Sequence, residues 1–278
     1  MSAIISALQT ELDQAVYALW VSRLCQVAGT TLVLWDHFIT LDLEFLYIWK
    51  SFSVATVLYV IIRYLGDAAA IIGVIALLLP PSNETVSRGI QNALGWIPLI
   101  ILLCTQIVLQ ARIYALCRRS KRILAFMLVL FLAEAIALFV LIGGAVRSIE
   151  VVSIPFVNIK TCLASQADRP SQIVWVIILC FEGILFILVL WIGISHGYTG
   201  LRRDFFGRSV FKSLIRGNVF YFACVMVACI TDEAVSRILG EEWILIPSAI
   251  SDTMEVIVGC RLILNLHASL LRDTLSED

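Results

Sequence analysis

Carboxylates inside long apolar runs are the residues of this sequence best placed to do chemistry. Glu134 and Glu182 each lie near the middle of such a run, and Asp232 lies towards the end of another. Asp252 and Glu255 are three residues apart in the last run, so a helix would place them on one face. An ionised carboxylate at the centre of a bilayer costs about 2.5–3.5 kcal/mol on insertion scales. We therefore expect these acids to face the interior of a helix bundle, where they can bind a cation or hold a proton.

The depths of these residues predict a shared cavity in the outer half of the bundle. At about 1.5 Å per residue, Arg23, Glu182 and Asp252 lie at one level, on the order of 12 Å below the outer surface. Glu134 and Glu255 are expected a little deeper and Asp232 a little shallower, and Gln106 adds a polar group from the third run. The predicted ligand-binding residues are Arg23, Gln106, Glu134, Glu182, Asp232, Asp252 and Glu255. Because the acids outnumber Arg23, either some of them carry a proton or the cavity holds a cation or an amine. The alternative for each single polar residue is a hydrogen bond between helices.

Three classes of function fit such a cavity. A receptor or sensor would bind a small molecule or a cation there. An intramembrane acid-catalysed enzyme, similar to a terpene cyclase, would use Glu182 or Asp252 as proton donor. A proton or cation transporter would use the acids as a relay. We expect no cofactor. Retinal is excluded because all four lysines, Lys50, Lys121, Lys160 and Lys212, lie outside the apolar runs.

Composition and hydropathy indicate a multi-span membrane protein of the all-α class. The chain has 278 residues, of which 60% are hydrophobic and 15% charged, with a net charge of −1 and a mean hydropathy of +0.96. These values exclude a soluble enzyme, a disordered chain and a nucleic-acid binder. Isolated histidines give no metal site. Seven runs are long enough to cross a bilayer, and they leave no room for a separate soluble domain within 1–278. The runs are 15–36, 53–79, 95–115, 123–146, 173–195, 217–238 and 244–266.

The distribution of Lys and Arg predicts an N-terminus outside and a C-terminus in the cytoplasm. If alternate connections starting at 36–52 are cytoplasmic, that side carries thirteen of the 20 basic residues. A sequon at Asn83 then falls outside, as a glycosylation candidate. The basic loops 112–122 and 202–216 fall inside, where they can contact a cytosolic partner. The plasma membrane is the expected location.

An acidic stretch follows the first run. Asp36, Asp42 and Glu44 are expected in the first cytoplasmic loop. There they would pair with Arg112, Arg118 or the 202–216 cluster and hold the cytoplasmic face together. The alternative is that they form a docking surface for a cytosolic partner. Arg63 and Asp67 are four residues apart on one helical face and are expected to pair with each other.

The same stretch carries a recognisable pattern. Residues 35–44 read Trp-Asp-His-Phe-Ile-Thr-Leu-Asp-Leu-Glu, followed by Ile48-Trp49-Lys50, Leu58-Tyr59 and Arg63-Tyr64. This pattern resembles a large family of fungal, chiefly basidiomycete, membrane proteins defined by a domain of unknown function. Weaker similarities follow at 110–116 and 261–266. The resemblance implies a seven-span fungal membrane protein and no established activity.

Overall fold

Over the residues that it describes, the computed structural model of the chain is a bundle of seven α-helices. It describes residues 2–50, 53–79, 84–117, 119–147, 170–199, 208–239, 243 and 245–277. The helices are α1 (Ser2–Tyr47), α2 (Val54–Leu78), α3 (Glu84–Leu116), α4 (Lys121–Arg147), α5 (Pro170–Thr199), α6 (Arg208–Ile238) and α7 (Leu245–Glu277). The all-α class expected from the sequence is therefore confirmed.

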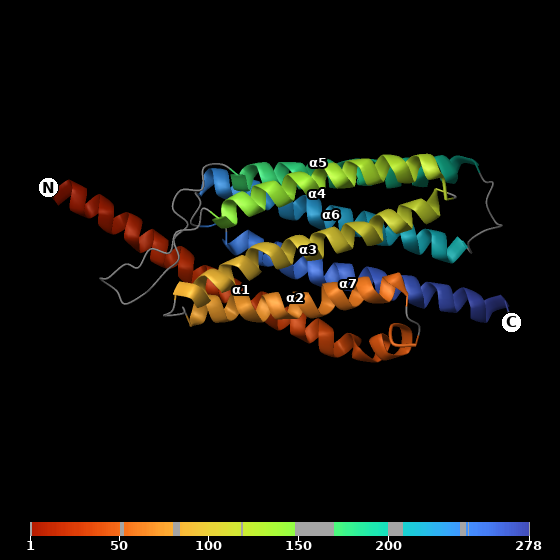
Figure 1. Cartoon of the computed structure of the whole chain (residues 1–278), viewed down its shortest axis with the longest axis horizontal. Coiled ribbons are helices and arrows are strands. Elements are labelled where there is room, and N and C mark those ends of the chain that lie inside the picture. Colours follow the sequence, from red (N-terminus) through yellow and green to blue (C-terminus); the bar gives the residue numbers. More distant parts are fainter. Residues whose placement is uncertain are drawn as a thin grey trace.

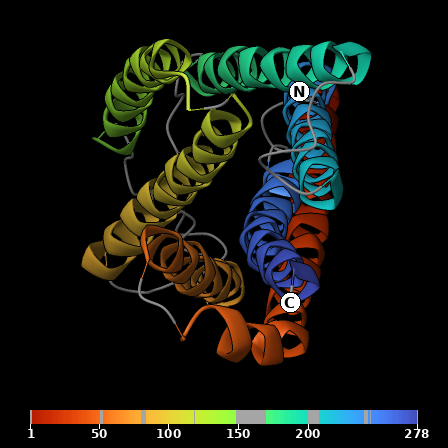
Figure 2. The same ribbon diagram turned by 90° about the vertical axis from the view of Figure 1, so that its right-hand side faces the viewer.

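The helices run side by side along the length of the molecule, and the two termini lie at opposite ends (Figure 1). The first turns of α1 project beyond the other helices. In the end-on view of Figure 2, α3 runs across the inside of the bundle. It contacts α2, α4, α5, α6 and α7, while α7 contacts α1, α2, α3 and α6. These two helices therefore position most of the interior.

Five of the helices are long and apolar enough to cross a membrane. They cover Leu12–Tyr47, Val54–Leu78, Thr85–Leu116, Lys121–Arg147 and Ile173–Ile192. Over their described residues, α6 and α7 do not meet the same criterion. These apolar helices indicate that the protein is embedded in a membrane.

The predicted loop at 36–52 is wrong, because α1 continues through it to Tyr47. Asp36, Thr40 and Glu44 are four residues apart, so they form one polar stripe along α1. All three are buried, whereas Phe38 and Phe45 on the same helix are exposed. The polar residues of this stretch lower its hydropathy, which predicts a loop. They are nevertheless buried against neighbouring helices, so the stretch stays helical.

The predicted basic loops are also largely helical. Residues 112–116 end α3 and residues 121–122 begin α4, leaving a turn of four residues. Arg119 closes that turn in the left-handed region, with φ of 57°, a conformation common just after a helix ends. Residues 208–216 belong to α6. Asn83, Arg118 and residues 202–207 lie outside the described residues.

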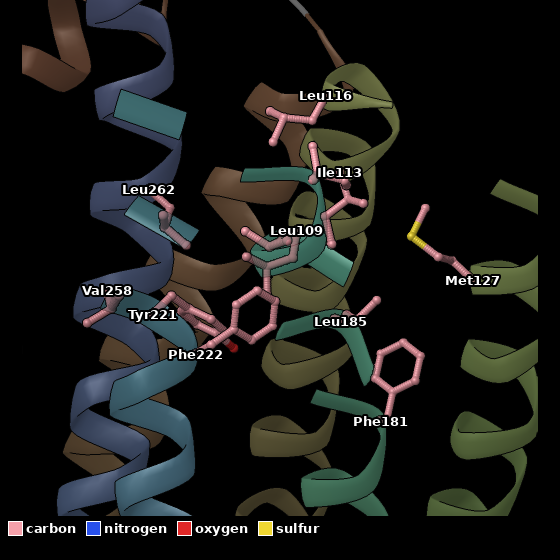
Figure 3. Close-up of a cluster of buried hydrophobic side chains, with 12 residues drawn as sticks. Leu109, Ile113, Leu116, Met127, Phe181, Leu185, Tyr221, Phe222, Val258 and Leu262 are labelled. Carbon is pink, nitrogen blue, oxygen red and sulfur yellow. The ribbon is translucent and has the colours of Figure 1, made fainter. Parts of the chain in front are cut away.

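A tight apolar cluster fills the bundle between α3, α4, α5, α6 and α7. Figure 3 shows its side chains converging from these helices. Leu109, Leu185 and Phe222 are fully buried at its centre, and Phe181 and Val258 lie at its edge. The two polar sites described below are a cavity that shares Tyr221 and Val258 with this cluster, and a group of charged residues along α1, α2 and α7.

Candidate functional site

A cavity of about 250 Å³ lies between α3, α4, α5, α6 and α7. Its α3, α4 and α5 walls are apolar and include Leu102, Leu138, Trp175 and Ile178. The polar groups come from the other side of the cavity. They are Tyr221 of α6 and Ser248, Ser251, Asp252 and Glu255 of α7. The cavity therefore has an apolar half and an acidic half.

The acidic half is built by one face of α7. The spacing of residues 248, 251, 252 and 255 is that of a single helical face. Asp252 is accessible and Glu255 is partly accessible. Glu255 lies close enough to Asp252 and Glu182 to interact with their charges. Among the residues that the structure describes, no Lys, Arg or His lines the cavity. This face can therefore attract a cation without competition from a built-in one.

Asp232 lies behind this face and orients it. The carboxylate is completely buried and accepts hydrogen bonds from Ser251 Oγ at 2.8 Å and Ser248 Oγ at 3.4 Å. It does not line the cavity itself. Its role in the geometry is to fix the two serine hydroxyls beside Asp252.

Gln106 joins two further acids beneath the cavity. Its Nε2 donates to Glu134 Oε1 at 3.1 Å and to Glu182 Oε1 at 3.2 Å. All three side chains are buried, with exposures of 4% or less. Each lies four residues from a cavity-lining residue on its own helix: Leu102 on α3, Leu138 on α4 and Ile178 on α5. The three polar residues therefore lie one helical turn from these lining residues.

Arg23 is not brought into this cavity. It lies on α1, which packs against α2 and α7, and it is not among the lining residues. Of the seven residues predicted to share one cavity, the structure places Asp252 and Glu255 on its surface, with Asp232, Gln106, Glu134 and Glu182 in buried positions around it. Ser248 was expected near the face of Asp252 and Glu255 but was not counted as a binding residue. Tyr221 and Ser251 were missed, although the four-residue spacing of Ser251 to Glu255 was a usable signal.

A second polar cluster joins α1, α2 and α7. Asp36 pairs with the buried Arg63 through Oδ2 and Nη1 at 2.8 Å, and with Arg261 through Oδ1 and Nε at 2.8 Å. Arg63 Nη2 also donates to Thr40 Oγ1 at 2.7 Å. The predicted pairing of Arg63 with Asp67 is wrong, because Asp36 on the facing helix is closer to the guanidinium. Asp67 instead contacts His37 Nδ1 at 2.5 Å.

Glu44 is the other centre of this cluster. Its carboxylate accepts hydrogen bonds from Trp49 Nε1 at 3.1 Å, Tyr64 Oη at 3.0 Å and Tyr59 Oη at 3.4 Å. His37 Nε2 lies 3.6 Å away. So many donors on one buried carboxylate indicate a structural joint between α1 and α2.

The partners predicted for these acids are therefore wrong. We expected Arg112, Arg118 or the 202–216 cluster, but Asp36 and Glu44 find their partners on α1, α2 and α7. Arg112 is buried and donates to the backbone carbonyl of Leu262. Asp42 is exposed. Sequence reasoning missed His37, Thr40 and Arg261. The four-residue spacing of Asp36, Thr40 and Glu44 was a usable signal for Thr40.

This second cluster coincides with a known family segment. Residues 24–68 match the model of the family of unknown function DUF6533. All members of the Asp36 and Glu44 cluster except Arg261 lie within the matched segment. The comparison with curated proteins gives no match. The DUF6533 segment therefore covers the hairpin of α1 and α2, and the cavity lies outside it.

Proposed function

We propose that this chain is a receptor-like membrane protein whose outer cavity binds a small amphiphilic amine. The observation that carries the proposal is the division of the cavity into an apolar half from α3, α4 and α5 and an acidic half around Asp252 and Glu255. An amine with an apolar body satisfies both halves at once. The carboxylates would bind the ammonium, and Trp175 would pack on the apolar body.

The size of the cavity favours a small ligand. Binding pockets for drug-sized molecules have volumes of about 300–1,000 Å³, and this cavity is slightly smaller at about 250 Å³. Ser248 and Ser251 supply hydroxyls beside the carboxylates, and Asp232 holds them in place. These groups can select a primary or secondary amine by hydrogen bonding, because a quaternary ammonium has no N–H to donate.

The apolar cluster below the cavity supports binding rather than open conduction. Leu109, Leu185 and Phe222 are fully buried in that cluster, and Figure 3 shows them among the side chains that extend from several helices into the interior of the bundle. A bound ligand would therefore sit in a pocket that ends inside the bundle. This arrangement is typical of a protein that senses a ligand on one side.

The topology belongs to the same proposal. With 31 and 33 residues, α6 and α7 are long enough to span a bilayer, and they run alongside the five apolar helices (Figure 1). Seven spans with the N-terminus outside would place the cavity mouth outside. The turn between α3 and α4 and residues 202–216 would then face the cytoplasm, where basic side chains can contact a signalling partner. A fungal plasma membrane is the proposed setting.

A thermal-shift experiment with matched ligands tests amine binding. The purified full chain in mild detergent is heated with 2-phenylethylamine or with its neutral analogue 2-phenylethanol. We expect the amine to raise the unfolding temperature in a saturable way and the alcohol to have little effect. Asp252→Asn and Glu255→Gln should lose the amine effect, whereas Glu233→Gln should keep it, because Glu233 pairs with Arg237 instead. Equal shifts by amine and alcohol, or retention of the shift in both cavity variants, would refute the proposal.

Cation transport is a second candidate. The observation that favours it is the position of Glu134 and Glu182 one turn below the cavity, which extends the acids towards the centre of the bundle. Reconstituted vesicles distinguish the two functions. A proton or cation flux that depends on Glu182 would favour transport, and amine binding without flux would favour the receptor.

A further inference from the structure

The three polar residues below the cavity remain unexplained by amine binding. Gln106, Glu134 and Glu182 come from α3, α4 and α5, and none of them lines the cavity. The amide of Gln106 holds the two carboxylates on either side of it by donating to one oxygen of each. Two acids brought together by one neutral donor concentrate negative charge in an apolar interior.

Each of the three side chains keeps one oxygen without a hydrogen-bond partner. These atoms are Gln106 Oε1, Glu134 Oε2 and Glu182 Oε2, and all are buried. Within the described residues, neither acid has an ion pair with a basic side chain. Buried polar atoms are normally satisfied. Three orphaned oxygens around one amide are therefore a feature that calls for a ligand.

We propose that Gln106, Glu134 and Glu182 form a buried site for a small hard cation, separate from the amine-binding surface. Carboxylate and amide oxygens are the ligands that such cations prefer. Ca²⁺ would balance both carboxylates, and Na⁺ would balance one of them. The shared chemistry is coordination by oxygen, and the experiment separates the two ions.

The cavity provides the route to this site. Leu102, Leu138 and Ile178 line the cavity one turn above the three residues. On α7, Glu255 lies deeper in the bundle than Asp252, and it is near enough to Glu182 to interact with its charge. The hydroxyl of Tyr221 also lacks a hydrogen-bond partner and lies within the electrostatic range of Glu182. A cation entering from the mouth would therefore meet acidic groups at successive depths.

Direct binding of radioactive ions tests the site. The purified full chain is equilibrated with ²²Na⁺ or ⁴⁵Ca²⁺ in a choline background, and bound ion is measured against concentration. We expect saturable binding of one of the two ions. Glu134→Gln and Glu182→Gln should each weaken it by about tenfold or more, because ligand charge sets affinity at such sites. Glu233→Gln is the control and should leave the affinity of the site unchanged, because Glu233 pairs with Arg237.

Several results would overturn this proposal. If the wild type binds neither ion in a saturable way, the proposal is refuted, and no variant is needed for that conclusion. Ion binding that Asp252→Asn abolishes while Glu182→Gln leaves it intact would move the site to the cavity surface. If the glutamine variants do not fold, a hydrophobic carbodiimide that modifies carboxyl groups tests the wild type. We expect the ion to protect Glu134 and Glu182 from modification. Equal modification with and without the ion would refute the cation site, because the two carboxyl groups would then be stabilised by protons or by the fold alone.

Discussion

Arg63→Met should destabilise the chain far more than Arg261→Met, although both arginines bind the same carboxylate. Arg63 is fully buried and donates to Asp36 and Thr40 at 2.8 and 2.7 Å. The side chain of Arg261 is 53% exposed. Removing one partner of a buried ion pair costs about 3–5 kcal/mol, whereas losing an exposed partner costs about 0–1 kcal/mol. Because Asp36 keeps Arg261 in the first variant, we expect a loss near 3 kcal/mol, at the lower end of that range.

The assay is the free energy of unfolding in mixed detergent micelles, followed by circular dichroism during titration with sodium dodecyl sulfate. The double variant Asp36→Leu/Arg63→Met provides the internal control. It leaves no buried charge without a partner, so it should lose less stability than Arg63→Met alone. Equal losses of stability for Arg63→Met and Arg261→Met would refute the reasoning. So would a double variant whose loss equals the sum of the losses measured for Asp36→Leu alone and Arg63→Met alone.

Three further outcomes are expected. Gly66→Ala should cost about 1–3 kcal/mol in the same titration, because the new methyl group would lie 2.6 Å from Val256 Cγ2, while Gly89→Ala, with open space around it, should cost nothing. Burial raises the pKa of the Cys117 thiol, so its alkylation should be slower than that of free cysteine at neutral pH and should still be increasing at pH values where free cysteine has levelled off; a profile that matches free cysteine would contradict this. A C-terminal epitope should bind antibody only after cells are permeabilised, and staining of intact cells would overturn the orientation.

Hydropathy predicted the helices in which apolar residues greatly outnumber polar ones. The run at 53–79 corresponds to α2 (Val54–Leu78), and the run at 123–146 corresponds to α4 (Lys121–Arg147). Prediction failed at the end of α1, where Asp36 and Glu44 lower the local hydropathy although both are buried. Hydropathy reports residue type and not the neighbour that a residue faces. A polar stripe that pairs with another helix is therefore easily mistaken for a loop.

Depth along a helix predicted only part of the candidate site. It placed Glu182 and Asp252 at similar levels, and Glu255 does lie within electrostatic range of both. It also placed Arg23 at that level, but Arg23 lies on α1 and outside the cavity lining. The level of a residue follows from its position in the run. The direction in which it points depends on helix rotation and on neighbours, which hydropathy alone does not specify.

The DUF6533 match and the candidate ligand site concern different parts of the molecule. The matched segment, 24–68, covers parts of α1 and α2, whereas the described residues that line the cavity all come from Leu94 onwards. Proteins that share this segment are therefore expected to share the joint around Asp36 without necessarily sharing a ligand. The two parts meet on α7, which presents Asp252 and Glu255 to the cavity and Arg261 to Asp36. Because α7 carries both sets of residues and packs against α1 and α2, we expect that a change that loosens the hairpin also weakens the proposed ligand binding.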